Sequence, residues 1–424
     1  MAYLESIDFN SHIATIVPGG GMDWRPEKNS KVISQLPQII WSDASPWREA
    51  NVWAKSIASS SISIKTVWSL MKHIHAYANW LERNEINWWD FPDRESERCL
   101  IRYRGDLIRS RDSGNLAPTT AQHRMSAVIR LYKWLVSNKV ISDSIPLWNE
   151  RQVGIFIRNS FGYRRTIIQK SSDLAIPCSP AIGECLEDGL LPVSHADVKT
   201  IMDFVEQHAS IELYLMLRLG FNTGMRFGSI SNLRVSTIYN AARKSSLDGY
   251  GRINLGPGAQ PPVHTKFGVN GQAFISHTDL GLMEDYCLSS RRLSRAAKAL
   301  PMDRDLVFLT RFGKPYGTEG SDFSQAINVE LFRIRKRALE SGLYCFKNFH
   351  FHQTRCTFAT ELARIALPYG AQFALQIVKE ALLHKNESTT IRYIKFIEKD
   401  AIMKKAADSF FMTMLHGDIA DESQ

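Results

Sequence analysis

The strongest fold signal in the chain is a stretch that opens as FHQTRCTFATELAR (residues 351–364) and closes as LLHKNESTTIRY (residues 382–393). His352 and Arg355 are three residues apart at a predicted helix start, so both side chains project from one face. His384 and Tyr393 follow on later predicted helices. Cations, imidazoles and a phenol are the groups with which a protein can hold a phosphodiester and attack it.

Length and composition set the outer limits of this reading. A chain of 424 residues is long enough for two or three domains. Its 52 Lys and Arg against 43 Asp and Glu give a net charge of +9, which is typical of a protein with a phosphate-rich partner. The 6 cysteines form no C-x-x-C pair, and no apolar run reaches the ~18 residues of a membrane span. With no secretory signal visible, we expect a reducing, cytoplasmic location.

The N-terminal part is expected to hold an arm and a helical domain. Residues 1–50 lack periodicity and are interpreted as an irregular arm. Within 51–140, apolar residues spaced by three and four from Ile64 to Leu81 predict an amphipathic helix, and further helices are expected over 95–111 and from Pro118. We interpret the basic residues on these helices as DNA backbone contacts. They are Lys65, Lys72, Arg98, Arg102, Arg104, Arg109, Arg124, Arg130 and Lys133.

A second pattern change separates a linker from a second domain. Residues 141–190 lose periodicity and carry prolines and a basic cluster, so they are interpreted as an extended linker. In 191–400, Ser194 is placed to cap a helix, and an apolar helix over 211–221 leads into TGMRFGSISNLR (223–234). Strand-like runs over 253–255, 263–266 and 272–275, with an Asn-Gly turn before the last, place Lys266 at a hairpin. Most of the remainder is expected to be helical.

In combination, these segments resemble the catalytic domain of the tyrosine recombinases, the phage integrase family. TGMRFGSISNLR is similar to the segment that carries the family's first arginine, and HTKFGVNGQAFIS (264–276) to its lysine hairpin. The sequence at 352–355 resembles its H-x-x-R box, LLH its second histidine and STTIRY its nucleophile segment. Carried over residue by residue, the resemblance gives a catalytic set of Arg226, Lys266, His352, Arg355, His384 and Tyr393.

The resemblance implies a mainly α fold that clamps DNA: a helical core-binding domain and a mixed α/β catalytic domain with a small β-sheet. It implies a site-specific recombinase that cleaves and rejoins DNA strands through a 3′-phosphotyrosyl intermediate, as the integrase or transposase of a mobile element. No cofactor and no metal are expected. The expected partners are double-stranded DNA with paired half-sites and further copies of the chain as a dimer or tetramer. Accessory DNA-bending or directionality proteins are further candidates, and no membrane is expected.

Residue chemistry suggests a role for each member of the set. Arg226 and Arg355 can clamp the nonbridging oxygens, and His384 can donate a further hydrogen bond. Tyr393 has a reference pKa of about 10 and needs a base, for which His352 is the candidate. Lys266 is the candidate acid for the leaving 5′ oxygen.

The chain also departs from the family pattern. Ser229 stands where an acidic residue often supports the first arginine, and Leu383 replaces the usual glycine before the second histidine. Thr354 and Cys356 replace the commoner leucine and histidine beside Arg355.

Other readings stay open at this stage. Tyr369 is the second candidate nucleophile, Lys244 and Lys314 are rivals of Lys266, and His350 with His352 forms an H-x-H pair that could bind metal. The whole protein could instead be a DNA-binding regulatory or structural protein, or an enzyme that cuts and reseals as a topoisomerase or hairpin-forming resolvase. Residues 401–424 are expected to form a C-terminal helix and a polar tail. We expect the helix to dock on a neighbouring protomer, and the alternative is that it folds back on its own domain.

Overall fold

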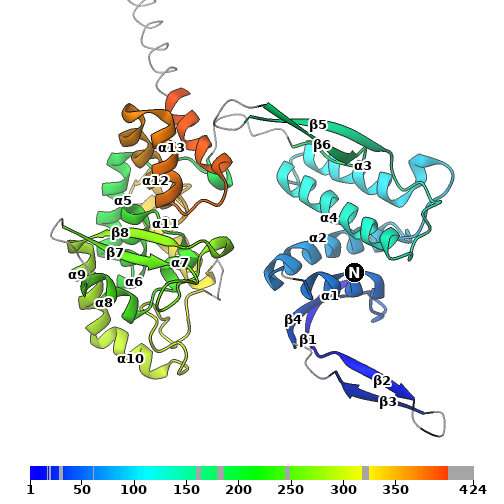
Figure 1. Cartoon of the computed structure of the whole chain (residues 1–424), viewed down its shortest axis with the longest axis horizontal. Coiled ribbons are helices and arrows are strands. Elements are labelled where there is room, and N and C mark those ends of the chain that lie inside the picture. Colours follow the sequence, from blue (N-terminus) through cyan, green and yellow to red (C-terminus); the bar gives the residue numbers. More distant parts are fainter. Residues whose placement is uncertain are drawn as a thin grey trace, which may run out of the picture. The chain divides into compact units, whose positions relative to one another are not determined.

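The structure is a computed structural model that describes residues 1–16, 18, 21–27, 32–60, 62–158, 164–178, 186–243, 249–317 and 324–399. The chain forms two compact units, residues 1–180 and 181–424 (Figure 1). The expected C-terminal helix and tail over 401–424 lie outside the described residues, as does Lys244. In the described part of the chain, no helix is long and apolar enough to cross a membrane.

Helices make up the centre of the first unit. They are α1 (Arg48–Ala58), α2 (Ile64–Arg83), α3 (Cys99–Asp112) and α4 (Pro118–Ser137), with the short turn η1 (Glu95–Glu97). Pro118 begins α4, as its fixed φ favours, and Ser63 caps α2 by accepting from the Thr66 amide. The helices predicted from Ile64 and from Pro118 are therefore confirmed.

An aromatic cluster forms the core of these helices. The hydroxyls of Tyr77 and Tyr132 lie 2.9 Å apart, and Tyr132 donates to the Trp88 carbonyl at 2.5 Å. Arg98, interpreted above as a DNA contact, is instead buried and donates to the carbonyls of Pro92, Asp93 and Pro146. It holds the chain together and is not part of a basic surface.

The N-terminal residues are not an irregular arm. β1 (Tyr3–Phe9) pairs antiparallel with β4 (Ile33–Ile40), and β2 (His12–Ile16) pairs with β3 (Met22–Pro26). Leu36 and Ile39 of β4 are buried in the helical core, and Asn51 on α1 bonds both the amide and the carbonyl of Ile39. The prediction failed because β1 and β4 pair across some 30 residues, and short-range periodicity does not report such pairing.

The expected linker over 141–190 is also largely structured. β5 (Glu150–Arg158) and β6 (Arg164–Ser172) form an antiparallel hairpin. On either side of it, Ile141, Leu147, Leu174 and Ile176 are buried in the core of the first unit. These residues therefore belong to that unit, and the division between the units falls after Pro180.

The second unit surrounds the β7–β8 hairpin with helices (Figure 1). Its elements are η2 (Glu187–Gly189), α5 (His195–His208), α6 (Ile211–Thr223), α7 (Phe227–Ser231), α8 (Val235–Arg243), β7 (Tyr250–Leu255), η3 (Lys266–Gly268), β8 (Gly271–Ser276), α9 (His277–Leu288), α10 (Ser290–Lys298), α11 (Gln325–Glu340), η4 (Tyr344–Phe346), α12 (Gln353–Ala366), η5 (Leu367–Tyr369) and α13 (Ala371–Ala381). Residues 387–399 form a further helical stretch. Ser194 caps α5 as predicted, accepting from the Asp197 amide.

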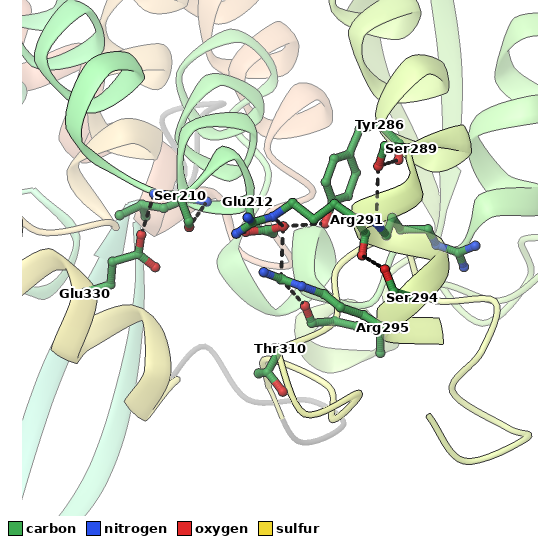
Figure 2. A network of polar contacts seen from close by, with 12 residues as sticks. Ser210, Glu212, Tyr286, Ser289, Arg291, Ser294, Arg295, Thr310 and Glu330 are labelled. Carbon is green, nitrogen blue, oxygen red and sulfur yellow. Dashed lines mark hydrogen bonds and ion pairs between the residues drawn. The ribbon is translucent and has the colours of Figure 1, made fainter. Parts of the chain in front are cut away.

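A buried ion network fixes the start of α6 (Figure 2). Glu212 is fully buried and accepts from Tyr286 at 2.9 Å and from Arg291 at 2.8 and 3.0 Å. Arg295 lies 3.0 Å from the same carboxylate. Because a buried charge is tolerated only when it is paired and hydrogen-bonded, this network ties α6 to α9 and α10. It holds the N-terminal end of the helix whose other end leads to Arg226.

Candidate active site

The two arginines of the predicted set are brought together where α6 ends against α12. The helix α6 stops at Gly224, whose φ of 65° is in the left-handed region. A Cβ at Gly224 would lie 2.3 Å from the Phe358 ring on α12, so both conformation and space require glycine. Arg355 donates to the Gly224 carbonyl at 2.7 Å and to the Leu382 carbonyl at 2.7 Å. The buried Arg355 thereby joins three segments of the site.

Four predicted site residues converge on one carboxylate that the sequence analysis did not single out, that of Glu187. Its Oε1 lies 2.6 Å from His384 Nε2, a close contact without hydrogen-bond alignment. Its Oε2 lies 3.2 Å from His352 Nε2, 3.7 Å from Arg355 Nε and 3.9 Å from Arg226 Nη2. The structure therefore places Arg226, His352, Arg355 and His384 around a single anionic group.

The electrostatics of Glu187 follow from this surrounding. Burial alone opposes the charge of its carboxylate, but the polar contacts from His352 and His384 and the charge of Arg355 outweigh burial. The pKa of Glu187 is therefore well below its ordinary value, and the carboxylate is ionised. Burial and the neighbouring Arg226 lower the pKa of Arg355 to about 10, which still leaves it cationic at neutral pH.

His384 is held from behind by Thr390. The Thr390 hydroxyl lies 2.9 Å from Nδ1 of the buried imidazole, so it can donate there and leave the ring proton on Nε2, the atom nearest Glu187. Burial lowers the pKa of His384, and Glu187 opposes that shift. The preceding Leu383 has a φ of 52°, a left-handed conformation that favours glycine and explains the usual glycine at this position.

Tyr393 lies beside this cluster with its hydroxyl directed elsewhere. The side chain is fully buried in an apolar cluster with Cys356 and Leu186. Its hydroxyl donates to Cys356 Sγ at 3.9 Å, and its ring stacks on His384 with centroids 6.2 Å apart. Burial raises the pKa of Tyr393 well above its ordinary value, and the nearby Cys356 and Glu187 add to that shift. The phenol is therefore protonated here.

In the described part of the chain, no hydrogen bond or ion pair joins Lys266 to these residues. The predicted strand over 263–266 is wrong: β7 pairs with β8, and Val263 makes only an isolated bridge to Gly256. Lys266 begins the turn η3 in the connection between the two strands. Its side chain is exposed, with Nζ 5.7 Å from the Phe267 ring centroid.

The rival readings receive less support from the geometry. Tyr369 is 76% exposed on η5 and contacts Phe373, outside the cationic cluster. The histidines and the carboxylate of this cluster, His352, His384 and Glu187, are residue types that commonly bind metal. The two arginines beside them would repel a divalent cation. Across the described ranges, no group of three or more His, Cys, Asp and Glu side chains has the arrangement of a metal site.

Glu187 and Thr390 are the site residues that sequence reasoning missed. Glu187 lies in a segment without periodicity, 165 residues from His352, so no local pattern links the two. Thr390 lies six residues after His384 on the next helical stretch, a spacing from which its contact could have been anticipated.

Comparison with known proteins bears on the family and the fold. Residues 193–399 match the phage integrase family. The Tn1549 transposon integrase in complex with a circular intermediate DNA superposes with a TM-score of 0.52 at 14% identity, covering 84% of this chain and 99% of that chain. The same integrase in complex with transposon right end DNA gives a TM-score of 0.50 at 14% identity, over 85% of this chain and 99% of that chain.

At such low identity, these superpositions establish a shared fold. No curated protein sequence matches the chain. The family match covers Arg226, Lys266, the H-x-x-R box, His384 and Tyr393 in a single domain, with the helices and the small sheet described above. Residues 193–399 therefore form a domain of the phage integrase family, the tyrosine recombinases.

Proposed function

We propose that this protein is a site-specific DNA recombinase in which Tyr393 is the nucleophile and Arg226, His352, Arg355 and His384 form the phosphate site. The observation that carries the proposal is the convergence of these four side chains on one oxyanion, the Glu187 carboxylate. A phosphodiester presents the same kind of group, two nonbridging oxygens that share a negative charge. In cleavage, negative charge grows on those oxygens, and preorganised cations stabilise it.

The reaction needs no reactant other than the DNA and the side chains of the protein. The phenolic oxygen of Tyr393 forms a bond to phosphorus while the bond from phosphorus to the 5′ oxygen breaks. The phenolic proton passes to His352, and Lys266 supplies a proton to the departing 5′ oxygen. The product is a 3′-phosphotyrosyl linkage, and attack on it by a 5′ hydroxyl rejoins the strand. Arg226, Arg355 and the Nε2 proton of His384 hold the phosphate throughout.

Two of the proposed catalytic side chains must move before this reaction can occur. Tyr393 has to bring its hydroxyl away from Cys356, and Lys266 has to reach the phosphate from its exposed position on η3. Both belong to segments that DNA could reposition, since Lys266 lies in a loop and Tyr393 on the stretch 387–399. We expect DNA binding to complete the site.

The substrate is proposed to be duplex DNA with paired half-sites at the ends of a mobile element, bound by a dimer or tetramer of the chain. The Tn1549 integrase, with which this chain shares a fold, was solved with a circular intermediate DNA. We also propose a cytoplasmic location, because cysteines stay as free thiols in a reducing compartment. The free thiols in the described residues are those of Cys99, Cys178, Cys287, Cys345 and Cys356.

The test is covalent capture on DNA. A randomised duplex library selected with Tyr393→Phe gives the binding site, and a nicked version of that duplex is then incubated with the unmodified protein. We expect a covalent complex that survives denaturation. Tight site-specific binding without any covalent complex would instead favour the DNA-binding regulatory protein.

A further inference from the structure

The carboxylate of Glu187 occupies the position at which the proposed phosphate site converges. Both histidines and both arginines face it, and the distances range from 2.6 Å for His384 to 3.9 Å for Arg226. The phosphate of a substrate would need the same contacts. Glu187 and a bound phosphodiester therefore exclude each other.

Glu187 could instead have the role of supporting Arg226, because Ser229 replaces the family's usual acidic residue. The distances argue against it. Arg226 is the most remote of the four partners at 3.9 Å, while His384 and His352 are nearer at 2.6 and 3.2 Å. Ser229 itself donates to the His264 carbonyl at 2.9 Å, away from Glu187. The carboxylate is placed at the shared centre of the site and not behind one arginine.

The described part of the segment that carries Glu187 is held against α12 by hydrogen bonds and by the buried side chain of Leu186. The Val193 amide donates to Thr357 Oγ1 at 2.9 Å, and Gln353 Nε2 donates to the Leu191 carbonyl at 2.9 Å, both on the first turns of α12. Leu186 is buried in the same apolar cluster as Tyr393 and Cys356. Displacing this segment would therefore empty the centre of the site and, at the same time, loosen the packing around Tyr393.

We propose that Glu187 is an internal substitute for the scissile phosphate, which keeps the DNA-free enzyme inactive until DNA displaces the 186–193 segment. The inference rests on the proposed function for the identity of the displacing ligand. The carboxylate satisfies the cations while no DNA is bound, and its charge also disfavours ionisation of Tyr393. DNA must displace an occupant that is already in place. The apparent affinity for DNA is therefore the intrinsic affinity multiplied by the fraction of molecules in which the site is empty.

The first experiment measures anion binding without DNA, with inorganic phosphate as the probe and sodium chloride holding the ionic strength constant. Glu187→Gln removes the charge but keeps the shape of the side chain. We expect it to bind phosphate about tenfold more tightly than the unmodified protein by calorimetry. Its melting temperature should fall without phosphate, because the cations lose their partner, and recover with it. Glu361→Gln, the same change at an exposed ion pair on α12, controls for the general loss of charge.

The second experiment measures the rate of covalent complex formation on the nicked duplex under single-turnover conditions. We expect Glu187→Gln to react about tenfold faster than the unmodified protein, with Glu361→Gln unchanged. If Glu187→Gln binds phosphate no better and reacts more slowly, Glu187 supports the site and the inference is overturned. Tighter phosphate binding in a chain that never forms a covalent complex would leave the inference standing and refute the proposed function. If Glu187→Gln does not fold, Glu187→Asp, with a shorter reach, should give an intermediate gain in phosphate affinity.

Discussion

The hydroxyl of Tyr393 donates to the sulfur of Cys356 at 3.9 Å, inside an apolar cluster. Sulfur is a weak acceptor, so the phenol is retained mainly by burial and by stacking on His384. Cys356 stands four residues after His352 and one after Arg355, where the family more often has a histidine. The residue next to the proposed phosphate site therefore also contacts the proposed nucleophile.

Cys356→Ala should release the nucleophile more readily. The substitution leaves the buried hydroxyl of Tyr393 without an acceptor, which destabilises the resting conformation. We expect covalent complex formation on nicked DNA to become faster by roughly twofold to tenfold. Cys287→Ala, at a second buried thiol of the same unit, is the matched control. A slower reaction with Cys356→Ala alone would mean that the thiol assists the active conformation.

Arg226→Ala and Arg355→Ala should both abolish efficient cleavage but differ in stability. Each removes a preorganised cation, so we expect a loss of at least ~10²-fold in single-turnover cleavage. Arg355 is buried and donates to two backbone carbonyls, which its removal would leave unsatisfied at roughly 1–3 kcal/mol each. Urea unfolding should therefore show a clear loss for Arg355→Ala and a much smaller one for Arg226→Ala. Near-normal cleavage by either variant would refute the arginine clamp.

Lys266→Ala should be rescued by a better leaving group. If Lys266 supplies the proton to the 5′ oxygen, a 5′-phosphorothiolate substrate no longer needs that proton, and cleavage should recover. His352→Ala, which removes the proposed base, should not be rescued. The measurement compares cleavage rates on the oxygen and sulfur substrates for both variants. Rescue of His352→Ala with no rescue of Lys266→Ala would reverse the two assignments.

The titration of His384 should report the charge of Glu187. Burial lowers the pKa of His384 below 6.5, and Glu187 opposes that shift, so Glu187→Gln should lower the pKa further. Because the unfolded chain binds this proton more readily, this residue contributes stability that rises with pH through the region below 6.5. Imidazole carbon chemical shifts followed against pH give the value for each protein. A higher pKa in Glu187→Gln would contradict the contact.

The helices and much of the site could be predicted because their signals are local. Periodic apolar residues and a serine or proline at the start define α2, α4 and α5, and the H-x-x-R spacing places His352 and Arg355 on one turn. The elements that were missed depend on distant partners. β1 is a strand because it pairs with β4. The prolines and basic residues around β5 and β6 led to the prediction of a linker, although the segments on either side of this hairpin are buried in the core.

The presence of Glu187 in the site could not be predicted either, because most of its partners are distant in the sequence. Nothing around Glu187 marks it as part of a cluster with residues more than 160 positions away. The placement of Lys266 was only partly anticipated, since the Asn270-Gly271 turn precedes β8 but the partner strand is β7. Sequence motifs therefore predicted the four side chains that converge, and the structure added Glu187, the carboxylate on which they converge.

We propose that Tyr393 attacks a phosphate held by this cluster, and the identity of the residue linked to DNA tests this proposal. The covalent complex formed on a nicked duplex is digested with protease and nuclease, and the nucleotide-bearing peptide is sequenced by mass spectrometry. We expect a nucleotide on Tyr393, and no complex with Tyr393→Phe although that variant still binds the duplex. A nucleotide on Tyr369, or a normal yield of complex from Tyr393→Phe, would contradict it.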